Sequence, residues 1–178
     1  MGTWYLSREL IGKPLISVTN GKRIAKVEGV LVDPEKLEVA GLVTSKGGLF
    51  KQEITVELGS KVEVWGEDAL LVSDAEAPLS EDQVPDLGEW LSVSDRLKGR
   101  EVVNAQGTRV GFLEDVLIDT RGRVVEYQLG QVFVEGEVTE AKRIPVERTR
   151  SLGQDVLVLE VAEKQAAGMA EASSESAT

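Results

Sequence analysis

The chain of 178 residues contains no cysteine and no histidine. This excludes disulfides, thiolate nucleophiles and Cys/His metal sites, and it also excludes histidine general bases and Ser-His-Asp triads. No phosphate-binding loop, dinucleotide fingerprint or nucleophile elbow is present either. We therefore expect a protein that is not an enzyme, with no catalytic, cofactor-binding or metal-ligating residues. The lack of cysteine suits a reducing cytoplasm, which is the expected location.

Long apolar runs and basic runs are also missing. Arg8, Glu9 and Lys13 interrupt the first eighteen residues, so no signal peptide is expected, and no window is apolar enough for a membrane span. The formal net charge is −11. Since an acidic surface repels phosphate backbones and anionic lipid, we expect neither direct nucleic-acid binding nor membrane adhesion.

Aromatic residues are few, at 4%, although the hydrophobic fraction is an ordinary 42%. Valine, leucine and isoleucine must then fill the core, and these side chains suit short strands in small barrels. The composition thus favours an all-β fold.

An internal repeat organises the sequence. Residues 21–33 read GKRIAKVEGVLVD and residues 107–119 read GTRVGFLEDVLID, at a constant offset of 86. The same offset aligns Val39 and Val43 with Val125 and Leu129, while the later segments 54–57 and 144–147 also resemble each other. A period of this kind predicts two copies of one module.

Each copy reads as short strands separated by turns. Asn20-Gly21 predicts a two-residue hairpin turn with positive φ at both positions. After it, Ala25, Val27 and Leu31 are expected on one face of a strand, and Ile24, Val30 and Val32 on the other. Gly29 interrupts this strand and Asp115 replaces it in the second copy, which predicts a β-bulge or a close backbone approach.

The segment between the copies is acidic and contains proline. It carries no Lys or Arg, Ser80 with Gln83 suits the cap of a short helical turn, and Trp90 with Leu91 is expected to anchor it on the second module. We predict two barrels at 1–74 and 93–161, a linker at 75–92, and a helical or disordered Ala/Ser/Glu-rich tail at 162–178.

Taken in order, these motifs resemble the PRC-barrel domain. Each copy has a turn of Asn or Gln, Gly, X and Arg, a strand that ends at Asp33 or Asp119, an Ile-X-Val strand, and a closing Asp-X-Leu-X-Val or similar strand. The resemblance covers about residues 7–74 and 93–161. It implies two small, strongly bent, six-stranded barrels that serve binding or assembly rather than chemistry.

The resemblance leaves three functions open. The family includes the cytoplasmic domain of the photosynthetic reaction-centre H subunit and the C-terminal domain of the ribosome maturation factor RimM. The chain is therefore interpreted first as an adaptor for a protein partner. The alternatives are a peripheral photosynthetic or membrane-complex component, and a ribosome assembly factor that binds a ribosomal protein. The two barrels are expected to pack on each other as a pseudo-dimer.

Partner-binding residues are sought among aromatic and loop positions. Trp4, Tyr5 and Trp90 are candidates because aromatics are enriched in binding hot spots, and Leu49 with Phe50 forms a second candidate in a glycine-containing loop. The competing hypothesis is that Trp4 and Trp90 each tie the preceding chain onto the barrel that follows, and that Trp65 covers an apolar edge.

Two pairs of acidic residues recur in both copies. Asp33 and Asp119 end equivalent strands, where aspartate usually accepts hydrogen bonds from turn amides. Glu28 and Glu114 are expected at polar positions on the barrel surface.

Overall fold

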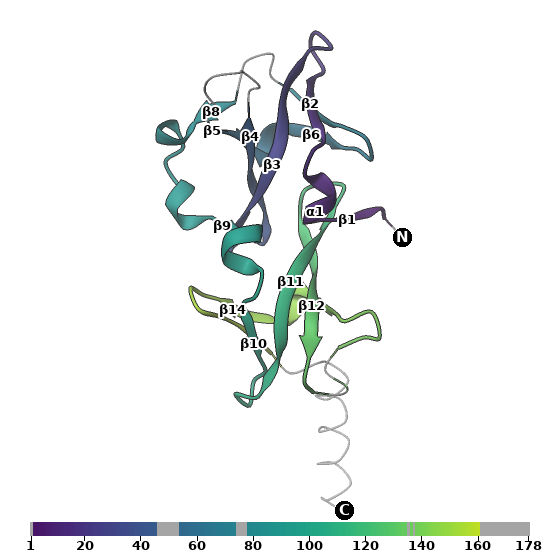
Figure 1. Cartoon of the computed structure of the whole chain (residues 1–178), viewed down its shortest axis with the longest axis vertical. Coiled ribbons are helices and arrows are strands. Elements are labelled where there is room, and N and C mark those ends of the chain that lie inside the picture. The colour runs from purple at the N-terminus through teal and green to yellow at the C-terminus, as the bar shows by residue number, and fades with distance from the viewer. Residues whose placement is uncertain (1, 46–53, 74–77, 135, 137, 161–178) are drawn as a thin grey trace, which may run out of the picture.

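The computed structural model describes residues 2–45, 54–73, 78–134, 136 and 138–160. Two β-sheet bodies lie one above the other along the long axis (Figure 1). The all-β class and the two tandem barrels are thus confirmed, and no helix among the described residues is long and apolar enough to cross a bilayer. The predicted tail, Leu49 and Phe50 lie outside the described residues.

The first sheet has the strand order β6-β7-β2-β3-β4-β5-β8, and β9 pairs with β3 beside this path. Strands β2 and β7 are parallel, whereas the other neighbours are antiparallel. The strands are β2 (Pro14–Ser17), β3 (Arg23–Asp33), β4 (Glu38–Ser45), β5 (Ile54–Leu58), β6 (Val62–Trp65), β7 (Leu70–Val72), β8 (Leu79–Ser80) and β9 (Leu91–Ser92). The 3₁₀ turns are η1 (Gly59–Lys61), η2 (Glu81–Gln83) and η3 (Leu87–Glu89).

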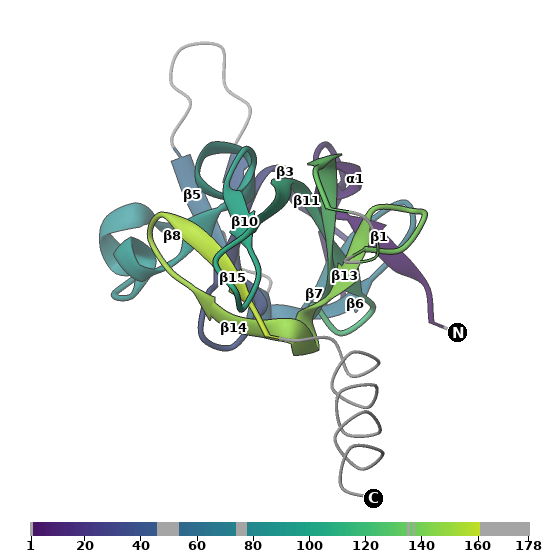
Figure 2. The same cartoon turned by 90° about the horizontal axis from the view of Figure 1, so that it is seen from below.

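The second sheet repeats this plan with the order β13-β12-β11-β10-β15-β14, and β1 pairs with β11. Viewed along the long axis, its strands are arranged in a ring (Figure 2). The strands are β1 (Trp4–Leu6), β10 (Glu101–Val103), β11 (Arg109–Asp119), β12 (Val124–Val132), β13 (Arg143–Pro145), β14 (Thr149–Leu152) and β15 (Val156–Leu159). The short helical elements are α1 (Ser7–Leu10), the π-helical turn η4 (Val93–Leu97) and the 3₁₀ turn η5 (Val146–Arg148).

Bulges bend the two long strands. The β3–β4 register shifts between Val27 and Gly29, and the β11–β12 register shifts between Leu113 and Asp115. The bulge predicted here is confirmed. A Cβ on Gly29 would lie only 3.3 Å from that of Val43, so the backbones also approach closely.

The bulge corrects the predicted faces of β3. Beyond it the alternation changes phase, so Val30 and Val32 share the main core with Val27. Leu31 instead faces outward, where it packs with Val56. The predicted grouping of Leu31 with Val27 was therefore wrong, because an extra residue on one strand reverses the faces that follow.

The hairpin predicted at Asn20-Gly21 is wider than two residues. Only Gly21 has a positive φ, +67°, and the ladder closes where Ser17 N–H donates to the Lys22 carbonyl, N···O 2.9 Å. Asn20 instead accepts a hydrogen bond from Lys22 N–H through its side chain, at 3.0 Å.

The strand that precedes each barrel pairs with the other barrel. Strand β1 places Tyr5 opposite Ile118 of β11, and β9 places Leu91 opposite Val32 of β3. Tyr5 and Leu91 are equivalent positions at the offset of 86, so the exchange is reciprocal. The expectation that Trp4 and Trp90 tie the chain to the following barrel was wrong, as was the anchoring of Leu91 on the second module.

The turns after the long strands are also exchanged. Val39 N–H donates to the Gly122 carbonyl at 2.8 Å, and Val124 N–H donates to the Leu37 carbonyl at 2.9 Å. Leu37 and Gly122 both adopt positive φ, +52° and +79°. These turns therefore occupy equivalent places around a pseudo-two-fold axis between the barrels.

One apolar core runs through both barrels. A single cluster of buried side chains contains residues of each copy, including Leu15 and Leu42 from the first and Leu113 and Leu157 from the second. The barrels are consequently packed as the predicted pseudo-dimer.

The segment at 75–92 folds onto the first barrel where it is described. Strand β8 pairs with β5, and Val84 joins a small second core with Leu31 and Val56. The predicted cap is present in part, since Gln83 Oε1 accepts a hydrogen bond from Ser80 N–H at 3.1 Å. The predicted domain limits stay predictions.

Strand pairing also corrects the repeat alignment downstream of the long strands. Val30 pairs with Leu42 and Val116 pairs with Tyr127, so Leu42 corresponds to Tyr127, at an offset of 85. Leu42 pairs with Glu57 and Tyr127 with Ile144, which aligns Glu57 with Ile144. The alignments of 39 and 43 with 125 and 129, and of 54–57 with 144–147, were out of step because turns and loops differ in length.

Candidate functional site

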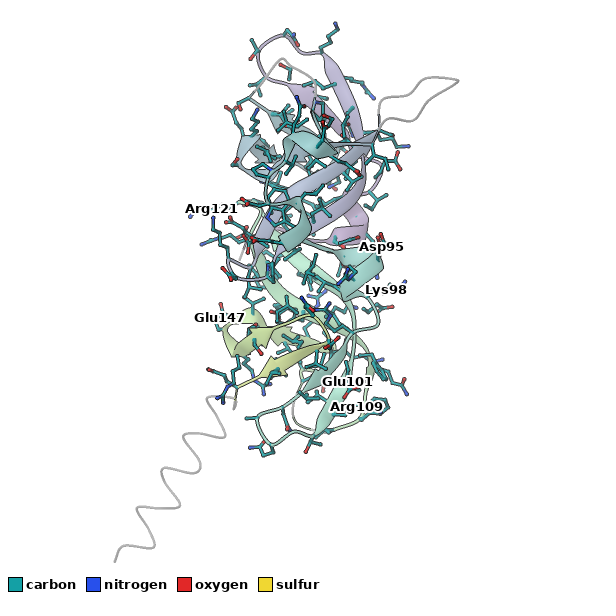
Figure 3. All side chains as sticks on the ribbon, turned by 90° about the vertical axis from the view of Figure 1, so that its left-hand side faces the viewer. Asp95, Lys98, Glu101, Arg109, Arg121 and Glu147 are labelled. Carbon is teal, nitrogen blue, oxygen red and sulfur yellow. The ribbon has the colours of Figure 1, made fainter. Side chains whose placement is uncertain are left out.

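The larger of two described clefts lies beside Trp90, and we call it the Trp90 cleft. It has a volume of about 380 Å³ and is walled by the segment 84–86, the start of β4, and the β11–β12 turn of the other barrel. Figure 3 views this side of the molecule, with Arg121 labelled on the turn. The lining residues are Asp33, Lys36, Glu38, Val39, Ala40, Leu58, Gly59, Ser60, Val84, Pro85, Asp86, Trp90, Arg121 and Gly122.

Trp90 is held by the outer face of the first barrel. A Cβ on Gly41 would lie 3.0 Å from Trp90 Cζ3 and 3.4 Å from Cε3, so the six-membered ring packs closely against β4. The indole N–H donates no hydrogen bond within the described part of the chain.

The Trp90 cleft is lined by two cations, Lys36 and Arg121, and three anions, Asp33, Glu38 and Asp86. Lys36 and Arg121 precede the equivalent residues Leu37 and Gly122, and the exchanged turns bring both to this cleft. Neither side chain forms an ion pair with a described residue. Glu38 and Asp86 supply opposite charge at the same rim.

The second cleft, the dyad cleft, lies between α1 and η4 and has a volume of about 310 Å³. Equivalent positions of the two copies meet in it, among them the recurrent Glu28 and Glu114. Arg8 and Lys98 also line it, and Glu28 accepts a hydrogen bond from Ser45 Oγ at 2.8 Å. Its rim is therefore polar and close to neutral.

Asp115, which lines the dyad cleft, has a structural role. This buried carboxylate accepts hydrogen bonds from Ser7 Oγ, from Arg8 N–H at 3.3 Å and from Val116 N–H at 2.7 Å. It thereby fixes α1 against β11. The equivalent positions in the other copy are Val93 and Gly29, so this carboxylate bond has no counterpart there.

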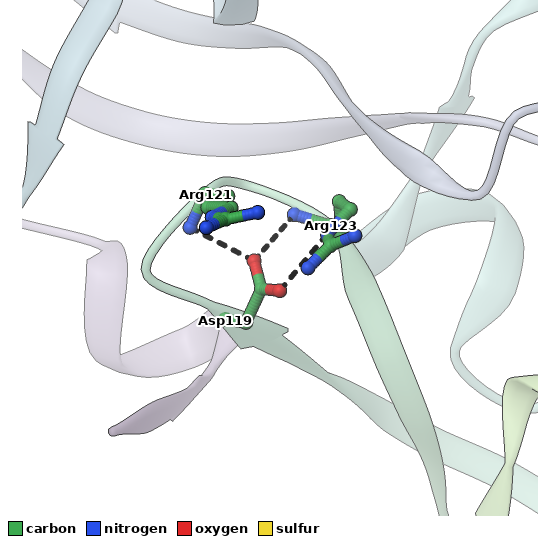
Figure 4. A network of polar contacts seen from close by, with 3 residues as sticks. All are labelled: Asp119, Arg121 and Arg123. Carbon is green, nitrogen blue, oxygen red and sulfur yellow. Dashed lines mark hydrogen bonds and ion pairs between the residues drawn. The ribbon is translucent and has the colours of Figure 1, made fainter. Parts of the chain in front are cut away.

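Asp33 and Asp119 accept hydrogen bonds from turn amides, as predicted. Asp33 Oδ1 accepts hydrogen bonds from Glu35 N–H at 2.9 Å and Lys36 N–H at 3.1 Å. Asp119 Oδ1 accepts from the amides of Arg121 and Arg123 at 2.8 and 3.0 Å, and its Oδ2 pairs with Arg123 Nε at 3.1 Å (Figure 4).

The predicted partner-binding residues do not gather at one place. Trp4 lies on β1 with 44% of its surface exposed, whereas the adjacent Tyr5 is buried. Trp90 lines the cleft beside the linker. Trp65 is buried and would lie 2.6 Å from a Cβ on Gly122, so it covers the turn of the other barrel.

Cations with shifted pKa values lie outside both clefts. Burial lowers the pKa of the Lys13 ammonium, against the raising effect of Glu9 and two further carboxylates, and its Nζ donates to the Gly66 carbonyl at 2.9 Å. Burial, aided by the charge of Arg96, lowers the pKa of the Arg100 guanidinium, which donates to the Gly153 carbonyl. These equivalent bonds join the residue before β2 or β10 to the turn of the last hairpin of the same barrel.

Tyr127 carries the largest described shift. Burial raises the pKa of its phenol to about 12, and its hydroxyl lies 2.6 Å from Thr149 Oγ1. This hydrogen bond closes β12 onto β14 inside the second barrel, so the shift reflects a structural position.

Sequence reasoning missed most of the Trp90 cleft. Lys36 and Arg121 stand at equivalent turn positions, and Pro85 is close to Trp90 in sequence, but only the exchanged turns bring the three together. It also missed the Phe112–Phe133 pair, an edge-to-face contact with ring centroids 5.6 Å apart, because strand pairing creates it. Within the described ranges, no group of three carboxylates could hold a metal ion.

Comparison with known proteins identifies both halves. The family model described as PRC-barrel domain matches residues 4–77 and 94–166. No curated protein matches the chain.

Proposed function

The chain belongs to the PRC-barrel domain family, and from this premise we propose that it is a non-enzymatic adaptor that binds a protein partner in the cytoplasm. The observation that carries the proposal is the Trp90 cleft, which both barrels and the linker build together. Because the cleft exists only when the two barrels are packed together, it is formed before any partner binds.

The electrostatics support binding over catalysis. Catalytic groups usually have perturbed pKa values and lie in clefts. Here the shifted groups are Lys13, Arg100 and Tyr127, whose hydrogen bonds join strands and turns away from both clefts.

Cross-linked affinity purification from source cells tests this function. The full chain is tagged, cross-linked in the cell and recovered for mass spectrometry, with a tagged acidic protein of similar size as the control. We expect one protein or assembly to be enriched over the control in the soluble fraction. Ribosomal proteins, or components of a photosynthetic membrane, would assign the adaptor to one of the alternative pathways.

A negative result is equally informative. Equal recovery of all proteins by the chain and by the control, with cross-linking efficiency verified on a known complex, would contradict the adaptor function.

A further inference from the structure

A pseudo-two-fold axis relates the two barrels, but the residues that meet across it differ in charge, size and polarity. We propose that three such pairs make each barrel accept the unlike barrel of its own chain and exclude a like barrel of a second copy. The partner that fits the joining surface of one barrel is therefore the other barrel. This inference concerns contacts inside the chain and does not depend on the adaptor function.

The first pair is one of opposite charges and lies on the axis itself. Glu38 of the first barrel and Arg123 of the second form an isolated antiparallel bridge. The backbone hydrogen bonds on its two sides join equivalent turns, so Glu38 and Arg123 are equivalent positions. Pairing of like barrels would place Glu38 opposite a second Glu38, or Arg123 opposite a second Arg123. Like charges directly opposite each other destabilise paired strands.

The second pair is one of size. Trp65 of the first barrel is buried, and a Cβ on Gly122 of the second would lie 2.6 Å from its Cζ2, so the indole needs a glycine there. The equivalent positions hold Leu152 and Leu37, and both pack in the common core. Two first barrels would force Trp65 against Leu37. Two second barrels would leave a gap between Leu152 and Gly122, and both faults are costly in a packed core.

The third pair is a buried hydrogen bond. Ser7 Oγ donates to the Asp115 carboxylate, and both residues are buried. Their equivalents are Val93 and Gly29. Two second barrels would bring Val93 to Asp115 and remove the hydroxyl donor from a buried carboxylate, whereas two first barrels would bring Ser7 to Gly29 and remove its acceptor. A buried polar group that loses its partner destabilises the complex.

The three pairs oppose like-barrel association by different means. Charge repulsion, misfitting volume and an unsatisfied polar group each penalise the wrong partner, while the same residues stabilise the right one. Specificity in protein association commonly combines both effects.

A first test repeats on one side of the axis the pair that exists on the other. Gly122→Leu should lower the melting temperature by about 10 °C or more, because leucine meets Trp65. Adding Trp65→Leu recreates the two leucines of the opposite side and should recover at least about half of that loss. The backbone accepts leucine, since Leu37 has positive φ at the equivalent place. Gly107→Leu, with φ +78° and open space around its Cβ, is the control, with a loss of about 2–4 °C.

A second test uses a thiol on the axis to report which barrels have met. The chain has no cysteine, so Arg123→Cys introduces a single thiol, which faces Glu38 in the native arrangement and an identical thiol when two second barrels pair. The variant Asp115→Gly/Gly122→Leu/Arg123→Cys also removes the size and polar obstacles to pairing of second barrels. In a glutathione redox buffer we expect it to form at least about tenfold more disulfide-linked dimer than Arg123→Cys alone. Gly107→Cys, on the turn at the other end of β11, measures dimers from random collision.

Two results would overturn the inference. One is a double variant Trp65→Leu/Gly122→Leu that is no more stable than Gly122→Leu. The other is an equal yield of dimer from the folded triple variant, from Arg123→Cys and from Gly107→Cys. The double variant decides alone if circular dichroism shows that the triple variant is unfolded. Neither measurement involves a partner protein, so their failure would leave the adaptor function standing.

Discussion

Gly122 shows how one residue links the two barrels. It adopts φ +79°, and a Cβ there would lie 2.6 Å from Trp65 Cζ2 and 2.9 Å from Cε2. At the equivalent position the first copy has Leu37, also at positive φ. Strand pairing aligns Trp65 of the first barrel with Leu152 of the second. The large Trp65 therefore goes with Gly122, and the smaller Leu152 goes with Leu37.

We predict that Gly122→Ala destabilises the protein by about 2–4 kcal/mol, because it adds backbone strain and pushes Trp65 out of place. Gly107→Ala is the matched control. It has nearly the same φ, +78°, but no atom within 4 Å of its Cβ, so only about 1 kcal/mol should be lost. Urea unfolding measures both. Equal losses would show that the contact with Trp65 carries no energy.

Tyr127 predicts a loss of stability at alkaline pH. The unfolded phenol releases its proton near pH 10.0 and the folded one only near 12, so between these values the unfolded state binds fewer protons. Stability should therefore be unaffected below pH 10 and fall by about 2–3 kcal/mol as the pH rises toward 12. Urea unfolding from pH 9 to 12 measures the slope. Tyr127→Phe should flatten it, and an unchanged slope would assign the loss to other groups.

Among the elements, the exchanged arms β1 and β9 matter most for how the barrels hold together. Tyr5 and Leu91 occupy equivalent positions in them, and both are buried with 9% exposure in the common core. Each arm is short, so its attachment depends on this single anchor more than on its few ladder bonds.

We predict that Tyr5→Ala and Leu91→Ala each lower the free energy of unfolding by about 2–4 kcal/mol. Amide hydrogen exchange should show that each substitution loosens the barrel with which the arm pairs. Tyr5→Ala should loosen amides at the end of β11, and Leu91→Ala those at the end of β3. Loosening confined to the barrel that follows each arm would contradict the exchanged pairing.

The outer faces of the barrels explain where the linker lies. Pairing registers align Val43 with Gln128 and Val56 with Arg143. The apolar pair lies under the linker segment, while the polar pair stands on the barrel that no described segment covers in this way. The polar pair is nevertheless partly buried, since Gln128 Oε1 and Arg143 Nε have almost no exposed surface.

The sequence predicts the repeat, the bulges and the turn aspartates because each depends on local chemistry. Gly29 and Asp115 mark the bulges, and Asp33 and Asp119 mark the turns, within a few residues of the feature they determine. The exchange of arms could not be predicted. The sequence around Trp4 and Trp90 does not distinguish the barrel that follows from the other one, and only the three-dimensional register decides between them. The Trp90 cleft depends on this exchange and was missed for the same reason.

At the scale of the whole molecule, a single core implies a single unfolding transition. The buried cluster contains side chains from both barrels, and backbone hydrogen bonds cross between the exchanged turns. Breaking one barrel would expose apolar surface of the other, so partly folded states should be poorly populated.

We predict coincident urea transitions for the two halves. Tryptophan fluorescence reports chiefly on the first barrel and the arms, while the amide NMR resonances of β12 report on the second. Equal midpoints and slopes are expected. Two separate transitions would show that the barrels are independent domains.

The linker packs on the outer face of the first barrel, so the two nearly equivalent barrels have different outer surfaces. Residues 84–86 of the linker form a wall of the Trp90 cleft on the first barrel. Duplication here has thus yielded two barrels with nearly the same skeleton and different outer surfaces.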